Sequence, residues 1–124
     1  MPRTSAAIKL WIRLTLPGVG QIGPGKIDLL RKIRKHQAIS AAAREMNMSY
    51  RRAWLLVDDL NAVFRRPVVA KWMGGKSKGG AKLTPTGEEL VEIYDAVVAH
   101  ATSANRAVLD ALATLAARRR ERRR

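Results

Sequence analysis

Two short helical patterns that follow each other closely constrain the fold of this chain more than any other feature. Ser40 can cap a small, alanine-rich helix that ends at Asn47, and Ser49 can cap a second helix that runs to about Phe64. Two helices separated by only a few residues form a helix-turn-helix, and small alanine side chains let such helices cross closely. The side chains that we expect on the buried face of the second helix are Ala53, Trp54, Val57, Leu60 and Phe64.

A pattern for a two-stranded hairpin follows the helix-turn-helix at once. Pro67 stops the second helix, and residues 68–73 then favour a strand. Residues 74–80 form a turn with four glycines, and residues 81–84 can return as the second strand. A helix-turn-helix followed by such a hairpin is the winged-helix arrangement, so we predict a mainly α fold with a small β component.

Two further elements are expected before the helix-turn-helix. Residues 7–16 alternate between apolar and polar side chains, which predicts a half-buried N-terminal strand, and residues 17–20 then break it. After residues 23–25, the pattern predicts an amphipathic helix of roughly three turns with basic residues on its polar side. The apolar face of that helix consists of Ile27, Leu29, Leu30 and Ile33.

The C-terminal part of the chain is expected to form one long helix. Thr84 or Thr86 can cap it, and no helix breaker interrupts the pattern that follows. Apolar residues recur at alternating spacings of three and four, which is typical of a coiled-coil seam and predicts a dimer. The seam residues that we expect to pair are Leu90, Tyr94, Val97, Ala101, Val108 and Leu115. The predicted organisation is a winged-helix domain over residues 1–84, a dimerisation helix over 85–117 and a basic, disordered tail over 118–124.

The chain is strongly basic, with a net charge of +14 over 124 residues and a pI of about 11.4. The segment RRRERRR at 118–124 contributes +5, so the rest of the chain still carries +9. A basic body of this size indicates a polyanionic partner, most often nucleic acid. The chain has no cysteine and no apolar run long enough to span a membrane. We therefore expect a cytoplasmic protein without a metal or cofactor.

The basic residues gather in the two elements of a winged helix that face a duplex. Residues 26–52 hold eight Lys or Arg, and residues 71–82 hold four Lys. The first residues of a recognition helix enter the major groove, where Arg can pair with guanine or with a phosphate. Glycines at the hairpin tip let the backbone approach phosphates, which Lys76 and Lys78 can also bind. The residues that we predict to contact double-stranded DNA are Ser40, Ser49, Tyr50, Arg51, Arg52, Lys76, Ser77 and Lys78.

Several of these residues also have plainer interpretations. Arg51 and Arg52 can be solvated side chains on an exposed helix face, and the hairpin tip can be a loop without a partner. Trp54 lies on the apolar face and is expected in the core rather than stacked on a base. We find no catalytic motif in the sequence, since the adjacent Asp58 and Asp59 point in different directions on one helix. An enzyme is therefore not expected.

Three stretches of the chain resemble a known family. They read IGPGKIDLLRKI, ISAAAREMNMSYRRAWLLVDDLNAVF and VVAKWMGGKSKGGAKLTPTGEELVEIYD, and with the first strand they cover about residues 8–98. The chain resembles here the N-terminal domain of ModE-type, molybdate-responsive regulators, and SYRRAW, GGKSKGG and LTPTG are the most specific segments. A related winged helix opens the LysR-type regulators. The chain departs from the ModE pattern at Gln37 and Ala38, where the family usually has Gly and Ser.

The resemblance implies a transcriptional regulator that binds a palindromic operator as a homodimer. It also implies that residues 49–52 lie on the reading helix and that Lys76 and Lys78 lie on the wing. ModE proteins carry molybdate-binding domains after the long helix, and we expect this chain to act without them. Two alternatives remain open: a nonspecific architectural DNA-binding protein, and a DNA-binding subunit that docks on a separate effector-sensing protein.

Overall fold

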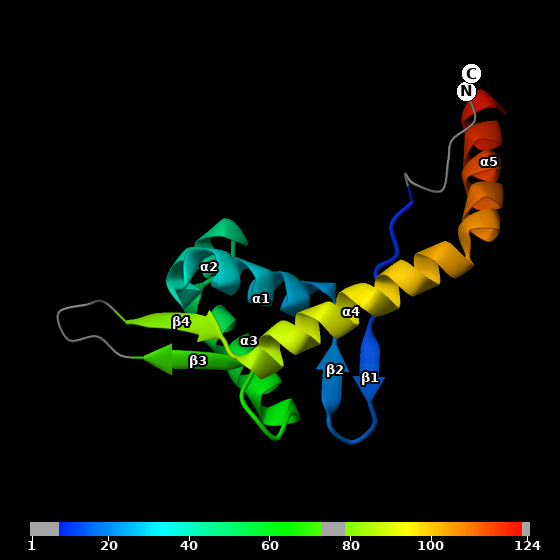
Figure 1. Cartoon of the computed structure of the whole chain (residues 1–124). Helices are drawn as coiled ribbons and strands as arrows, with labels where there is room; N and C mark the ends of the chain where they lie inside the picture. The colour runs from blue at the N-terminus through cyan, green and yellow to red at the C-terminus, as the bar shows by residue number, and fades with distance from the viewer. Residues whose placement is uncertain (1–7, 73–78, 123–124) are drawn as a thin grey trace. The chain divides into compact units, whose positions relative to one another are not determined.

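The computed structural model describes residues 8–72 and 79–122 of the chain. Helices and two antiparallel strand pairs follow one another in the order of a winged helix, so the predicted mainly α fold with a small β component is confirmed (Figure 1). The elements are β1 (Leu14–Leu16), β2 (Gly20–Ile22), α1 (Pro24–His36), α2 (Ile39–Glu45), α3 (Tyr50–Val63), β3 (Val69–Trp72), β4 (Gly80–Leu83), α4 (Pro85–Ala104) and α5 (Arg106–Arg122). Residues 12–94 form one compact unit, and the segments on either side of it form a second.

Helix α1 and the helix-turn-helix of α2 and α3 form the centre of the first unit. Ala42 and Ala43 of α2 are buried, which lets α2 approach both neighbouring helices closely. The face predicted for α1 is confirmed, and the fully buried side chains of α1 and α3 are Ile27, Leu29, Leu30, Ile33, Ala53, Val57 and Leu60. Phe64 is only half-buried, because α3 ends at Val63 and the backbone of Phe64 is already extended.

Ser49 caps α3 as predicted, whereas Ser40 does not cap α2. The Oγ of Ser49 accepts a hydrogen bond from the backbone N–H of Arg52 at 3.0 Å. α2 begins before Ser40, at Ile39, and the cap position is occupied by Ala38, which has no side-chain acceptor. Ser40 therefore lies within the first turn of α2, with an exposed side chain.

Two residues with left-handed backbone conformations form the turns on either side of α2. Asn47 has a φ of 56° just beyond α2, and asparagine tolerates this conformation better than most residues. Gln37 has a φ of 54° at the end of α1, where its N–H donates to the carbonyl of Ile33 at 2.7 Å. Position 37 is one of the two at which the sequence departs from the ModE pattern, and glycine adopts this conformation without a steric cost.

The N-terminal strand is shorter than predicted and pairs with a strand that we did not predict. Only Leu14–Leu16 of the expected residues 7–16 forms a strand, and it pairs antiparallel with β2. The predicted break is therefore a tight turn, in which Gly18 has a φ of 72°. A Cβ atom on Gly20 would lie 2.9 Å from the Cγ2 of Val63, so this hairpin packs closely against the end of α3.

The hairpin of β3 and β4, called the wing below, is attached to the helix-turn-helix at its base. The Oδ1 of Asn61 in α3 accepts hydrogen bonds from the N–H groups of Val68 and Val69 at 2.8 and 3.1 Å. Its Nδ2 donates to the Val69 carbonyl at 3.2 Å. On the other strand, the N–H of Ala81 donates to the Gln37 carbonyl at 3.1 Å. These bonds determine where the wing lies relative to α1 and α3.

The start of α4 is tied to the first strand of the wing. The Oγ1 of Thr84 accepts from the Gly87 N–H at 3.0 Å and donates to the Pro67 carbonyl at 2.6 Å, so Thr84 rather than Thr86 caps the helix. The Thr84 N–H also donates to the Val68 carbonyl at 3.0 Å. Gly87 packs so tightly that a Cβ atom on it would lie 2.1 Å from that same carbonyl oxygen.

The expected long C-terminal helix is divided in two by a turn at Asn105. The Nδ2 of Asn105 donates to the Ala101 carbonyl at 2.7 Å, and its backbone N–H donates to the same carbonyl at 3.1 Å. α5 then continues to Arg122, so the backbone of residues 118–122 is helical, in contrast to the disordered tail that we expected. Among the described residues of α5, Leu109 and Ala113 are buried.

Candidate nucleic-acid interface

The first turn of α3 presents large side chains to solvent. Tyr50 is 53% exposed, and Arg51 and Arg52 are exposed as well. Ser49 holds the start of the helix through its cap, so these three side chains leave from a well-ordered backbone. The structure therefore brings four of the predicted contact residues together at one end of α3.

Helical geometry gives the exposed residues of α3 different directions. Successive residues of an α-helix are turned by about 100°, so Arg51 lies roughly opposite the buried Ala53 and Leu60. Leu55, one turn after Arg51, shares this outward direction and is 54% exposed. The sequence analysis missed Leu55, although its spacing of four from Arg51 was a usable signal. Together, an Arg and an apolar side chain on one face can contact guanine and a thymine methyl group in a major groove.

The basic residues of α1 are mostly neutralised within the chain. The ion pairs of this helix are Arg31–Asp28 at 3.0 Å, Lys32–Glu45 at 3.5 Å, Arg34–Glu88 at 3.2 Å and Lys35–Glu45 at 3.2 Å. The hydrogen bond of Glu45 with His36, followed by the one with Lys35, lowers the pKa of the Glu45 carboxyl to about 2. Half of the eight basic residues that we assigned to the DNA-facing region are therefore engaged with acidic side chains.

The basic residues around the start of α3 differ from those of α1. Arg51 and Arg52, together with Arg13 before β1 and Lys26 in the first turn of α1, form no ion pair within the described part of the chain. Arg13 and Lys26 were not among the predicted contact residues. Since an unpaired cation attracts phosphates more strongly than a paired one, the start of α3 is suited to a polyanion.

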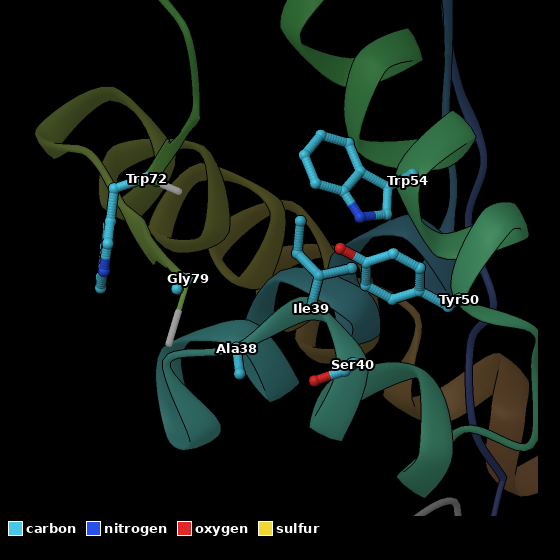
Figure 2. Close-up of a pocket in the computed structure, with 8 residues that line it drawn as sticks. Ala38, Ile39, Ser40, Tyr50, Trp54, Trp72 and Gly79 are labelled. Atoms are coloured by element: carbon cyan, nitrogen blue, oxygen red, sulfur yellow. The ribbon is translucent and has the colours of Figure 1, made fainter. Parts of the chain in front are cut away.

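A pocket of about 410 Å³ lies beside this part of α3, between α2 and the wing (Figure 2). Figure 2 shows Tyr50 and Trp54 of α3 near Ile39 of α2, with Trp72 of the wing farther along the wall. Its lining residues are Ala38, Ile39, Ser40, Tyr50, Trp54, Trp72, Gly79 and Gly80. The predicted residues Ser40 and Tyr50 thus line one pocket, although their elements are separated in sequence.

Trp54 is half-buried and lines this pocket, so the expectation that it lies in the core is not met. Its ring meets that of Tyr50 edge to face with centroids 5.9 Å apart, and the Lys71 Nζ lies 4.0 Å from its centroid. Lys71 also pairs with Asp58 at 2.8 Å, which places this lysine between the wing and α3. The indole Nε1 of Trp54 is buried without a hydrogen-bond partner among the residues that the structure describes.

The remaining predicted DNA contacts, Lys76, Ser77 and Lys78, lie outside the described residues. Their role in binding stays a prediction.

The residues of the predicted dimer seam fall into two groups. Leu90 and Tyr94 are 7% and 4% exposed, and the Tyr94 hydroxyl donates to the Ile12 carbonyl at 2.6 Å, so the chain itself already buries them. Val97 and Ala101 are half-buried. Val108 and Leu115 are exposed, as is Leu112, which we did not predict. Only the members on α5 therefore offer a large apolar surface to a partner.

Within residues 8–72 and 79–122, no three His, Cys, Asp or Glu side chains come together to hold a metal ion. No helix in the same ranges is both long and apolar enough to cross a membrane.

Comparison with known proteins connects this arrangement to regulators. The chain is 44% identical to the molybdenum-pterin-binding protein MopB of Rhodobacter capsulatus over 79 residues, a stretch that makes up 64% of the chain and 29% of MopB. It is 39% identical to the transcriptional regulator ModE of Yersinia pestis over 72 residues, a stretch that makes up 58% of the chain and 27% of that ModE. The chain is homologous to ModE-type regulators.

The ModE-type similarity extends to the DNA-binding transcriptional dual regulator ModE of Escherichia coli K12, at 36% identity over 72 residues, or 58% of the chain and 28% of that protein. The ModE relatives from Yersinia pestis and Escherichia coli are named as regulators, and the Mop relatives as binding proteins. The chain spans less than a third of the length of these curated relatives. No family model matches the chain.

Proposed function

We propose that the chain is a ModE-like transcriptional regulator that binds a specific, palindromic DNA operator as a homodimer. The observation that carries this proposal is the distribution of charge: Arg51 and Arg52 at the start of α3 form no ion pair within the described residues, whereas four of the five Lys and Arg residues of α1 are paired with acids. In a winged helix, this end of the recognition helix enters the major groove. Arg51 and Leu55 would then face base edges, with Tyr50 toward the backbone.

The test of DNA recognition is a selection of bound duplexes from a random pool at about physiological salt, with the salt dependence recorded. An enriched palindrome supports the proposal. Tight binding without enrichment, together with a steep salt dependence, would contradict sequence-specific recognition and favour the architectural alternative. Arg51→Ala is expected to lower discrimination between the enriched and a scrambled duplex by about 1–3 kcal/mol if Arg51 reads a base.

The dimeric state is proposed on the exposed apolar residues of α5. Val108, Leu112 and Leu115 are spaced by four and three, so they share one helix face, and each is more than half exposed. Val108→Asp combined with Leu115→Asp should convert the dimer to a monomer in sedimentation experiments, while Thr114→Asp, on another face, should not. A wild-type monomer at micromolar concentration would refute dimerisation, and a stoichiometric second protein on α5 would favour the docking-subunit alternative.

The biological setting that we propose is the control of molybdenum-related genes. The relatives carry names that include molybdenum-pterin binding and, in Azotobacter vinelandii, molybdenum transport. Mapping the enriched operator onto the genome tests this setting, because operators upstream of genes without a molybdenum connection would argue against it.

A further inference from the structure

A second pocket, of about 370 Å³, lies on the opposite side of the start of α3 from the one shown in Figure 2. It is formed between the β1–β2 hairpin, the first turn of α1 and the first half of α3. Its lining residues are Arg13, Gln21, Gly23, Pro24, Gly25, Lys26, Met48, Arg52 and Leu56. Three of these residues are cationic, and none is acidic.

The cations of this pocket are held in place by neutral groups. The Nη1 of Arg13 donates to the Gln21 Oε1 at 3.4 Å, and the Nζ of Lys26 donates to the Gln21 carbonyl at 3.0 Å. Such bonds orient the side chains without cancelling their charges, in contrast to the carboxylates that neutralise α1. Arg52 adds a third charge from α3. Because like charges repel, a convergence of three cations is favourable when an anion completes the pocket.

The position of the pocket relative to α3 indicates which anion it fits. A helix with its side chains is about 10–12 Å wide and fills the major groove, which is about 12 Å wide. Side chains on the outward face of α3, such as Arg51, then meet base edges, whereas groups at its sides meet the sugar-phosphate backbones. Arg52 lies on such a side, so its pocket would lie where a backbone phosphate passes if α3 entered the groove.

We propose that this pocket, called the hairpin pocket below, seats one backbone phosphate of duplex DNA through Arg13, Lys26 and Arg52. The inference rests on the proposed function and deepens it. It makes the β1–β2 hairpin part of the DNA interface, and it gives Arg52 a positioning contact while Arg51 keeps the base-reading one. The hairpin pocket and the pocket beside the wing lie on opposite sides of α3, as the two DNA strands do on opposite sides of a groove.

The experiment compares charge-removing variants of the full chain by fluorescence anisotropy over a range of salt concentrations. Each variant is titrated with the enriched duplex and with a scrambled one. Arg13→Gln and Lys26→Gln should each weaken binding roughly tenfold, and by the same factor for both duplexes. The double variant should lower the slope of log K against log salt by about one, the contribution of one phosphate.

Two further variants act as controls. Arg66→Gln removes the same charge beyond the far end of α3, from an exposed side chain, and should leave affinity and slope close to the wild type. Arg13→Lys keeps the charge and should retain most of the binding. Since Arg13→Lys changes the shape of the side chain but keeps its charge, retained binding would show that the loss in Arg13→Gln comes from the missing charge and not from a disturbed hairpin.

Three results would overturn the inference. If Arg13→Gln and Lys26→Gln bind duplex with the same affinity as Arg66→Gln, the pocket contacts no phosphate. A loss confined to the enriched duplex would show that the pocket reads bases instead. Wild-type chain that binds no duplex at all would refute the proposed function and this inference together, whereas the first two results leave the proposed function standing.

Discussion

Replacing Gly87 by alanine adds one methyl group and should lower the free energy of unfolding substantially. A Cβ atom there would lie 2.1 Å from the Val68 carbonyl oxygen. A carbon and a carbonyl oxygen need about 3.3 Å even in a close contact, so α4 and the wing must separate by about 1.2 Å. That movement stretches the 3.0 Å hydrogen bond from the Thr84 N–H to the same oxygen beyond a useful length.

The expected loss can be assembled from three terms. Displacing a packed helix costs about 1–3 kcal/mol, leaving a buried carbonyl without its donor costs about 1–3 kcal/mol, and the better helix propensity of alanine returns about 1 kcal/mol. We therefore expect Gly87→Ala to lower the free energy of unfolding by about 3 kcal/mol, measured by urea denaturation followed by circular dichroism.

Gly25→Ala is the matched control for this substitution. Gly25 lies in the first turn of α1, and a Cβ atom on it would meet no atom within 4 Å. This variant should be neutral or more stable by up to about 1 kcal/mol. If Gly87→Ala loses less than about 1 kcal/mol, or if both variants change stability equally, the argument from the close approach of α4 to the wing is wrong.

The remaining predictions concern a cap, a hydrogen bond and an ion-pair cluster. Ala38→Ser supplies the acceptor missing from the cap of α2 and should raise the unfolding free energy by about 1 kcal/mol in urea; no gain would contradict the cap assignment. Tyr94→Phe removes the bond to the Ile12 carbonyl and should cost about 1 kcal/mol in the same assay, whereas a neutral result would argue against that bond. The folded pKa of Glu45, about 2, lies below its ordinary 4.5, so its contribution to stability is complete above pH 4.5 and is lost as the pH falls toward 2. Acid denaturation of Glu45→Gln should show a smaller loss over that interval than the wild type, and parallel curves would refute the depressed pKa.

The helix-turn-helix and the wing could be predicted because their signals are local. The cap at Ser49, the alanines of α2 and the apolar spacing of α1 each lie within a few residues of what they determine. The second strand of the β1–β2 hairpin was missed for a related reason. β2 has three residues, which is too short for an alternation to be read, and the turn before it depends on the left-handed backbone of Gly18.

The division between α4 and α5 could not be read from the apolar pattern, which continues unbroken past Asn105. Asparagine is only a moderately poor helix residue, and its backbone N–H still donates to the Ala101 carbonyl at 3.1 Å, so neither the residue type nor a lost helix bond marks the turn. Burial of Leu90 and Tyr94 by the chain itself likewise depends on tertiary packing that a heptad spacing cannot reveal.

The electrostatic character of the candidate interface was only half predictable. The number of basic residues is a property of the sequence, but their pairing is not, since Arg34 meets an acid 54 residues away at Glu88. Likewise, Arg13 and Arg52 come to one pocket from different elements. The sequence therefore predicted a basic surface, while the structure distinguishes the cations that are free from those that are not.

The acidic partners of α1 have a consequence for the kinetics of target search. Asp28, Glu45 and Glu88 act as built-in counter-ions, and each lowers the attraction of the protein for phosphates in general. A DNA-binding protein that holds nonspecific sequences too tightly spends its time on the wrong sites, because genomes offer so many of them. If the chain binds DNA as proposed, these acids would shorten each nonspecific encounter and leave discrimination to the few residues at the start of α3.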